Sequence, residues 1–253
     1  MTKKIFLSVV MPMFNEAENL KRGVLKQVDS FLEKQDYLSE VIISDDGSTD
    51  QSLELAERFI KGHPRFSLIK NAHGGKPFAI RSGIEKARGD LVLFTDMDQS
   101  TPIDQINKLL PYFDKGHAVV IGSRGMGRQD FPWYRKLMAF GFRTFRRMIL
   151  LKNIVDTQCG FKAFKREVVK ELFDNLQIFK EAKTVKGWRV GAFDVELLFL
   201  AQKKGYKIAE VPVAWQDRDL ALGKERKFFK ESKEMLKEIL RVKLNDLRGV
   251  YNR

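Results

Sequence analysis

The chain has 253 residues, 43% of them hydrophobic, which is enough apolar material for one large or two small domains. Its 46 Lys and Arg against 33 Asp and Glu leave a formal net charge of +13, which indicates anionic partners such as phosphorylated substrates, acidic lipid or nucleic acid. The single cysteine, Cys159, excludes an intrachain disulfide, and no apolar run approaches the roughly 18 to 20 residues of a membrane-spanning helix. We therefore expect a soluble or peripheral protein of a reducing compartment, without a signal peptide.

Short apolar runs alternate with helix-forming segments up to about residue 122. We expect strands at 5–11, 41–44, 66–70, 91–94 and 118–122. Helices are expected between them, and the first begins after Asn15, a residue type that caps helix N-termini well. Such an alternation predicts an α/β fold with a mainly parallel sheet and helices on both faces.

No internal repeat or low-complexity linker divides the chain. Its composition changes only near residue 223, where a strongly charged segment begins. We therefore predict one domain at 1–222 and a basic, amphipathic helical tail at 223–253.

Polar residues follow three of the expected strands at the point where each strand ends. Residues 12–16 follow the first strand, residues 45–50 follow the second, and Asp96 and Asp98 follow the fourth. Parallel strands end at one edge of their sheet, where such folds bind ligands. A carboxylate such as Asp46 can accept hydrogen bonds from a base or ribose, and the last two aspartates can hold Mg²⁺ or Mn²⁺ that clamps a diphosphate. Any one cluster also fits a turn, but three on one edge favour a nucleotide site.

Six segments together resemble a known enzyme family. VVMPMFNEAENL at 9–20, SDDGSTD at 44–50 and TDMDQSTP at 95–102 resemble the family 2 glycosyltransferases with the GT-A fold. DTQCGFK at 156–162, FDVELL at 193–198 and IAEVPV at 208–213 are similar to the dolichyl-phosphate (polyprenyl-phosphate) glucosyltransferases within that family. The resemblance covers about residues 5–224. It implies inverting transfer of a hexose, glucose from UDP-glucose, to a polyprenyl or dolichyl phosphate at a membrane surface, with Mg²⁺ or Mn²⁺ as cofactor.

The resemblance implies a role for each position that matches a family motif. The nucleotide sugar would be bound by Pro12, Phe14, Asn15, Glu16, Asp46, Lys76, Arg81 and Asp96. The metal would be held by Asp96 and Asp98, and the acceptor phosphate would be met by Arg124 and Arg135. The catalytic residues would be Asp156, Asp98 and Glu196. In the basic segment that contains Lys76 the family has two glycines where this chain has Pro77 and Phe78.

Several of these residues also fit ordinary structural roles. Lys76 and Arg81 fit a solvated helix face, and Asp156 fits a helix N-cap. Glu196 lies in an apolar run, where a buried carboxylate is costly unless it is paired. A phosphate monoester is largely ionised at neutral pH, since its second pKa is about 6. An acceptor of this kind needs no strong general base, so we interpret Asp156 as an orienting group.

Two segments combine apolar and basic residues in a way that suits a membrane interface. Residues 131–152 place aromatic residues and methionines on one helical stripe and four arginines on another. The pattern alone fits a core-packing helix equally well, and the resemblance favours the interfacial helix. The tail at 223–253 has a second apolar face. We therefore expect peripheral attachment to an anionic membrane surface on its cytoplasmic side.

Two other functions remain open from the sequence. The first is a family 2 glycosyltransferase that uses another nucleotide sugar, such as GDP-mannose or UDP-GlcNAc, or a non-lipid acceptor. The second is a basic module that binds membrane or nucleic acid without turnover. The chain has no recognised nucleic-acid motif, so we expect no nucleic-acid partner. The sequence does not fix the oligomeric state.

Overall fold

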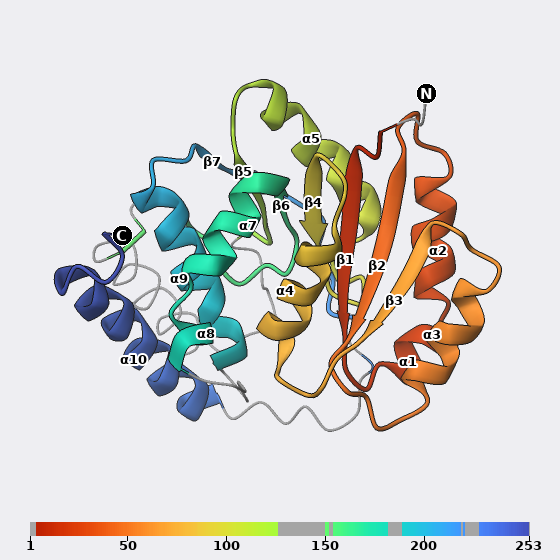
Figure 1. Ribbon diagram of the computed structural model, residues 1–253, viewed down its shortest axis with the longest axis horizontal. Helices are drawn as coiled ribbons and strands as arrows, with labels where there is room; N and C mark the ends of the chain where they lie inside the picture. Colours follow the sequence, from red (N-terminus) through yellow and green to blue (C-terminus); the bar gives the residue numbers. More distant parts are fainter. Residues whose placement is uncertain are drawn as a thin grey trace.

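The computed structural model describes residues 4–125, 150–151, 154–181, 189–218, 220 and 228–252, and its centre is a twisted sheet with helices on both faces (Figure 1). In the described residues seven strands form this sheet in the order β3-β2-β1-β4-β6-β5-β7. Their bounds are β1 Leu7–Met13, β2 Ser39–Asp45, β3 Phe66–Lys70, β4 Leu91–Phe94, β5 Val119–Ser123, β6 Lys162–Lys165 and β7 Ile208–Pro212. Strand β6 runs antiparallel to β4 and β5, and the other pairs are parallel. The predicted mainly parallel sheet is confirmed.

Strands β1 to β5 match the five predicted strands, with ends that differ by up to two residues. Strands β6 and β7 were not predicted, because each breaks the apolar pattern with a charged residue. Lys162 begins β6 and Glu210 lies in the middle of β7.

Helices cover both faces of the sheet because strand side chains alternate between two cores. On one face α2 (Val24–Leu32), α3 (Ser52–Ile60) and α5 (Ile106–Asp114) pack in the core that contains Val9 and Met11 of β1. On the other face α4 (Lys76–Lys86), α7 (Arg166–Asn175) and α9 (Arg189–Lys203) pack in the core that contains Val10. The short helices α1 (Ala17–Lys21), η1 (Ile103–Gln105) and α8 (Ile178–Glu181) lie in connections.

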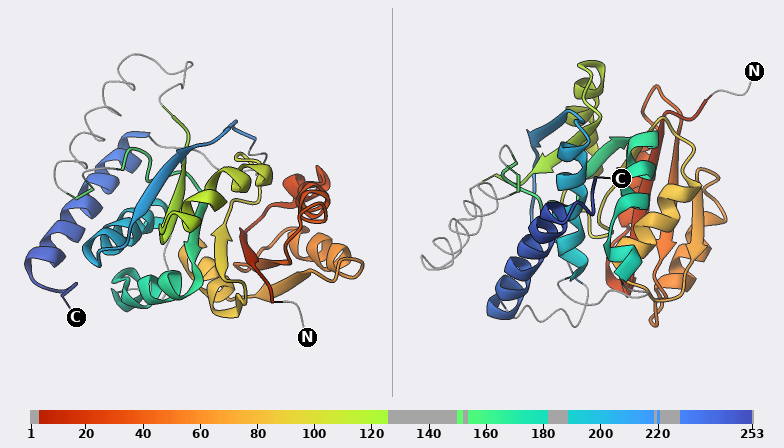
Figure 2. Two further views of the ribbon diagram at one scale, coloured as in Figure 1. Left: turned by 90° about the horizontal axis from the view of Figure 1, so that it is seen from above. Right: turned by 60° about the vertical axis from the view of Figure 1, so that its left-hand side comes forward.

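The C-terminal helix α10 (Phe228–Leu247) lies against α9 at one edge of the molecule (Figure 2). Its residues Ile239 and Val242 are buried in the same core as α9. The helix falls in the predicted tail, while the boundary near residue 223 stays a prediction. No helix in the described part of the chain is both long enough and apolar enough to span a membrane. The interfacial segment predicted at 131–152 lies outside the described residues except for 150–151.

The sheet register brings the predicted strand ends together. Met13 at the end of β1 pairs with Asp45 at the end of β2, and Val10 of β1 pairs with Phe94 at the end of β4. The polar residues after these three neighbouring strands therefore share one edge of the sheet, as expected for a ligand site. Helix α4 packs closely on β1, because a Cβ at its Gly83 would overlap the side chain of Val10.

Candidate functional site

Asp46, which follows β2, anchors the loop between β3 and α4. Its buried carboxylate accepts hydrogen bonds from the backbone N–H of Gly74 at 2.8 Å and of Gly75 at 2.9 Å, and it lies 3.0 Å from the ring of His73. Gly75 has a φ of 104°, which favours glycine. These bonds fix the backbone that leads into Lys76. Pro77 stands in the first turn of α4, where an N–H is not needed, so its replacement of a family glycine is compatible with this loop.

The segment after β1 is tied to the segment after β2. Asn15 has a φ of 55°; its N–H donates to Ser48 Oγ at 3.0 Å and its side-chain oxygen accepts from the N–H of Thr49 at 2.8 Å. The carboxylate of Glu16 accepts from Asn19 at 2.6 Å. These bonds hold the segment in the turn that follows β1.

Phe14 and His73 form an aromatic pair at the same edge. Their rings are stacked with centroids 4.5 Å apart, and Phe14 is among the exposed large hydrophobic residues. Pro12 lies one residue before the end of β1, opposite Ser44 of β2. The sequence pattern gave His73 no role. Its ring lies beside Phe14 because Asp46 anchors the loop that carries it, and residue spacing does not show this contact.

The centre of the edge is a group of charged residues that we name the Asp96 cluster: Asp96, Asp98, Lys76, Lys162 and Asp194. The ammonium of Lys76 donates to Asp96 Oδ1. Asp98 Oδ1 accepts from the N–H of Ser100 at 2.7 Å, and the backbone carbonyl of Asp98 accepts from Arg22. The structure thus brings together three residues that the sequence analysis assigned to the metal, the diphosphate and the nucleotide sugar.

A divalent cation fits this cluster if the substrate completes its coordination. No group of three or more metal-binding side chains occurs in the described residues. Two aspartates, Asp96 and Asp98, are what Mg²⁺ commonly takes from a protein when phosphate oxygens and water supply the rest. The Asp96 side chain is 38% exposed and therefore reachable by such a substrate.

Lys162 and Asp194 are two members of the cluster that the sequence analysis missed. Lys162 is fully buried on β6; its Nζ lies 2.7 Å from Asp194 Oδ1 and donates to the carbonyl of Cys159 at 2.5 Å. Burial raises the pKa of Asp194, and the attraction of Lys162 and then Lys76 offsets part of this effect. A signal was present, since the segment FDVELL at 193–198 contains an Asp-x-Glu motif whose first acid is Asp194, and only its second acid, Glu196, was chosen.

Gly160 fixes the position of the Asp96 carboxylate. A Cβ at Gly160 would overlap Asp96 Oδ2, so the backbone lies directly against that oxygen. The bond from Lys162 to the carbonyl of Cys159 holds this turn in place. Burial lowers the pKa of Lys76, but Asp96 and then Asp194 raise that pKa by more, to above its usual range. Lys76 is therefore a cation wherever Asp96 is ionised.

Arg124 and Asp156 form a second ion pair near the cluster. Asp156 Oδ2 accepts from Arg124 Nε at 2.7 Å, and Oδ1 accepts from the other arm of the guanidinium at 2.8 Å. Burial raises the pKa of Asp156, but the hydrogen bonds and charge of Arg124 lower that pKa by more, to well below its usual range. The guanidinium also lies 5.7 Å from the ring of Trp215. A carboxylate so held suits an orienting role better than that of a base.

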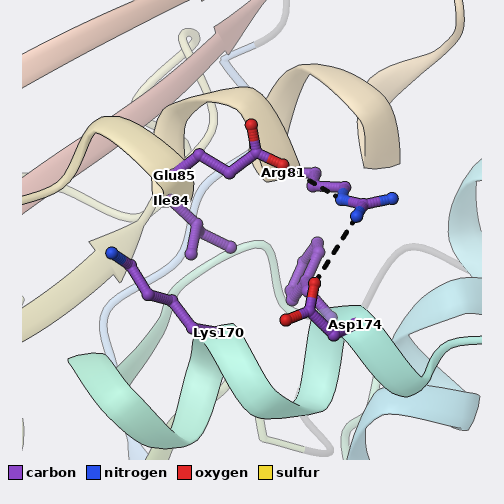
Figure 3. A pocket seen from close by; sticks show the side chains of 6 residues that line it. Arg81, Ile84, Glu85, Lys170 and Asp174 are labelled. Carbon is purple, nitrogen blue, oxygen red and sulfur yellow. Dashed lines mark hydrogen bonds and ion pairs between the residues drawn. The ribbon is translucent and has the colours of Figure 1, made fainter.

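Arg81 contacts residues outside the Asp96 cluster. It bonds Asp174 of α7 at 3.4 Å and Glu85 at 3.2 Å, and its guanidinium lies 5.0 Å from the ring of Phe179. Figure 3 shows its side chain directed at Asp174 across a shallow pocket between α4 and α7. The predicted role of Arg81 in binding the nucleotide sugar therefore rests on the resemblance alone. Arg135 lies outside the described residues.

Glu196 belongs to a different group, the Glu196 cluster: Glu196, Gln177, Glu238, Arg241 and Tyr251. The fully buried carboxylate accepts from the N–H of Gln177 at 2.8 Å, from the hydroxyl of Tyr251 at 2.9 Å and from Arg241 at 3.3 Å. Arg241 also donates to Glu238 at 2.6 Å. Burial raises the pKa of Glu196, and the charge of Arg241 offsets part of this effect. These contacts join α9 to α10, and the predicted catalytic role of Glu196 rests on the resemblance alone.

Comparison with known proteins gives three consistent findings. A family model described as "Glycosyl transferase family 2" matches residues 8–173. The dolichyl-phosphate beta-glucosyltransferase of Dictyostelium discoideum is 33% identical over 98% of this chain and 76% of its own length. The human protein of the same name is 33% identical over 97% of this chain and 77% of its own.

Among solved structures, glucosyl-3-phosphoglycerate synthase from Mycobacterium tuberculosis in complex with Mn²⁺, UDP-glucose and phosphoglyceric acid aligns with a TM-score of 0.64 at 18% identity, covering 94% of this chain and 80% of that one. The mannosyltransferase PcManGT from Pyrobaculum calidifontis, in complex with GDP-Man and Mn²⁺, aligns with a TM-score of 0.60 at 20% identity, covering 95% and 64%. At these identities the likeness is one of fold.

Proposed function

This chain belongs to glycosyl transferase family 2 and has the GT-A fold, and from that premise we propose that it transfers glucose from UDP-glucose to a polyprenyl phosphate such as dolichyl phosphate. The family, the fold and the glycosyltransferase class that the sequence predicted are confirmed. The glucose donor and the lipid acceptor are proposed because curated relatives at 33% identity bear the name dolichyl-phosphate beta-glucosyltransferase.

The observation that supports the proposal most is the convergence of three strand ends on the Asp96 cluster. Residues 12–16 and 45–50 and the Asp96–Asp98 turn lie at one edge of the sheet, with Lys76 held there by the Asp46 anchor. We assign the base and ribose to the side of Phe14, Asn15 and Asp46, and the diphosphate to the side of Asp96 and Lys76. The donor would then lie across the carboxyl ends of β1, β2 and β4.

In the proposed reaction an oxygen of the acceptor phosphate attacks the anomeric carbon of glucose. The bond from that carbon to the diphosphate breaks with inversion, and UDP leaves with the bonding electron pair. A divalent ion held by Asp96 and Asp98 would supply a Lewis acid for the charge on the leaving diphosphate. Arg124 places positive charge where two anionic substrates must meet, and Asp156 holds its guanidinium in one orientation.

The acceptor implies that the protein works at a membrane surface, and α10 offers a face for it. Leu240, Leu244 and Leu247 are exposed on one side of this helix. Lys237 and Arg248 are exposed beside them, a combination that suits the headgroup region of an anionic membrane. Attachment on the cytoplasmic side of a membrane stays a prediction, and so does the role of residues 131–152 in this attachment.

The test is a matrix of donors and acceptors with the purified protein. UDP-glucose, GDP-mannose and UDP-GlcNAc are each incubated with Mn²⁺ and either dolichyl phosphate, 3-phosphoglycerate or no acceptor, and product is separated into lipid and aqueous phases. We expect glucose in the lipid phase from UDP-glucose with dolichyl phosphate, and its loss on addition of EDTA. Transfer of another sugar, or transfer to the soluble acceptor alone, would replace the proposal by the corresponding alternative.

A further inference from the structure

Lys76 and Asp96 are ion-paired in a place that the donor must use. The Lys76 ammonium bonds Asp96 Oδ1, the carboxylate that the proposed function assigns to the metal and the diphosphate. The two side chains are 32% and 38% exposed, so solvent and ligands reach the pair. A cation that arrives at Asp96 therefore competes with an ammonium that is already there.

The carboxylate cannot avoid this competition by turning away. Gly160 lies directly against Asp96 Oδ2, and the turn that carries Gly160 is fixed by the buried ammonium of Lys162 through the carbonyl of Cys159. Behind it Asp194, which is itself paired with Lys162, adds negative charge near Lys76. Asp96 is thus the fixed member of the pair.

Lys76 is the member that can move, and it can do so without a change of backbone. The two residues before it are bonded to Asp46 through their N–H groups, and α4 is seated on β1 through Gly83. Its long, flexible side chain starts from this fixed point. A rotation of the side chain alone can therefore take the ammonium off Asp96 while the backbone stays in place.

We propose that Lys76 is an exchangeable counter-ion of Asp96, which keeps a free divalent ion off the site until the nucleotide diphosphate arrives. The diphosphate brings negative charge that binds the ammonium and also completes the coordination of the metal. Metal binding is thereby coupled to nucleotide binding. This inference rests on the proposed function, because it takes Asp96 as a metal ligand.

The test measures Mn²⁺ binding directly, by the loss of the electron paramagnetic resonance signal of free Mn²⁺, with and without UDP. The variants are Lys76→Met and Lys76→Gln, which remove the charge and keep most of the length. Lys86→Met is the matched control, since it removes one charge from an exposed position on the same helix. Thermal unfolding checks that each variant is folded.

We expect the wild-type protein and Lys86→Met to bind Mn²⁺ weakly without UDP and much more tightly with it. Both Lys76 variants should bind Mn²⁺ without UDP about tenfold more tightly than the wild type, because one repelling charge is gone. Their gain in affinity on addition of UDP should shrink accordingly. The binding measurement does not depend on glucose transfer. If Lys76→Met does not fold, Lys76→Gln alone tests the inference.

Unchanged or weaker Mn²⁺ binding by folded Lys76 variants would overturn the inference. If the wild type still binds Mn²⁺ with UDP in that case, the metal site of the proposed function stands and Lys76 is only a diphosphate ligand. If no protein binds Mn²⁺ even with UDP, the metal site itself fails, and the inference fails with it.

Discussion

The Asp96 cluster and the Glu196 cluster both pair buried or half-buried carboxylates with cations, but they differ in how far those carboxylates are enclosed. Glu196 is fully buried, and its oxygens accept from a backbone N–H, a tyrosine hydroxyl and an arginine. Asp96 is more than a third exposed, and its Oδ1 accepts from the ammonium of Lys76, which ends a flexible side chain. An enclosed carboxylate with fixed donors suits cohesion between elements, whereas an exposed one with a mobile partner suits ligand exchange.

The two clusters meet on one helix. Asp194 and Glu196 are two residues apart on α9, which places them about 200° apart around the helix axis. Asp194 faces Lys162 and the edge of the sheet, and Glu196 faces Arg241 and Tyr251 near the C-terminus. One short acidic motif therefore serves the site on one side of α9 and the attachment of α10 on the other.

The largest expected effect on stability is at Glu196. Glu196→Ala removes one acceptor from Arg241, which keeps Glu238, and one from the buried Tyr251 hydroxyl. Losing one partner of a buried ion pair costs about 3 to 5 kcal/mol. Urea unfolding monitored by circular dichroism gives this value. Asp96→Ala is the counterpart and should cost far less, since Lys76 is returned to solvent. A loss below about 1 kcal/mol in Glu196→Ala, the range of an exposed ion pair, would contradict the contrast.

Asp156 is an intermediate case, near the site but enclosed by Arg124. Because its pKa is lowered in the folded protein, its stabilisation is fully present above the unfolded pKa of about 3.9 and is lost as the pH falls below that value. We expect Asp156→Asn to be less stable than the wild type by about 1.5 to 3 kcal/mol near neutral pH, the range for hydrogen bonds to charged groups. Urea unfolding at a series of pH values should show this difference shrinking in acid. A difference that does not vary with pH would show that the ion pair is not its source.

The smallest expected effect is at Gly160. Gly160→Ala forces the Asp96 carboxylate to shift, and changes in groups that orient a metal ligand typically weaken metal binding about 10- to 100-fold. We expect a value near the lower end of this range, because only one methyl group is added. The Mn²⁺ concentration for half-maximal activity measures it. Gly62→Ala is the control, since a Cβ there meets no neighbour within 4 Å. If both variants need the same Mn²⁺ concentration, Gly160 does not position the Asp96 carboxylate for metal binding.

The sequence predicted the edge of the sheet well because that prediction needs only local information. Apolar strand runs that end in polar residues show in the pattern, and parallel strands share an edge. The pairing of Lys76 with Asp96 is not local, since it depends on the Asp46 anchor that aims Lys76. Lys162 was missed because a lysine seldom marks a buried strand.

The Asp-x-Glu motif shows a second limit. The sequence analysis chose only Glu196 from the two acids of this motif, Asp194 and Glu196. Which acid faces the site depends on the rotation of α9 about its own axis, and packing against the sheet and α10 decides that rotation. Arg81 is a similar case, since its place on α4 turns it toward Asp174 rather than Asp96. A family motif therefore indicates the region of the site, while the rotation of each helix decides which of its side chains lie there.

One measurement tests the division of roles between the two clusters most directly. Glucose transfer from UDP-glucose to dolichyl phosphate is followed at several Mn²⁺ concentrations for the wild type, Asp98→Asn and Glu196→Gln, and thermal unfolding is recorded for all three. We predict that Asp98→Asn loses at least about 100-fold in turnover while its unfolding temperature stays close to that of the wild type. Glu196→Gln should unfold at a lower temperature and keep wild-type turnover below it. Full activity in Asp98→Asn, or loss of turnover in a folded Glu196→Gln, would contradict the account.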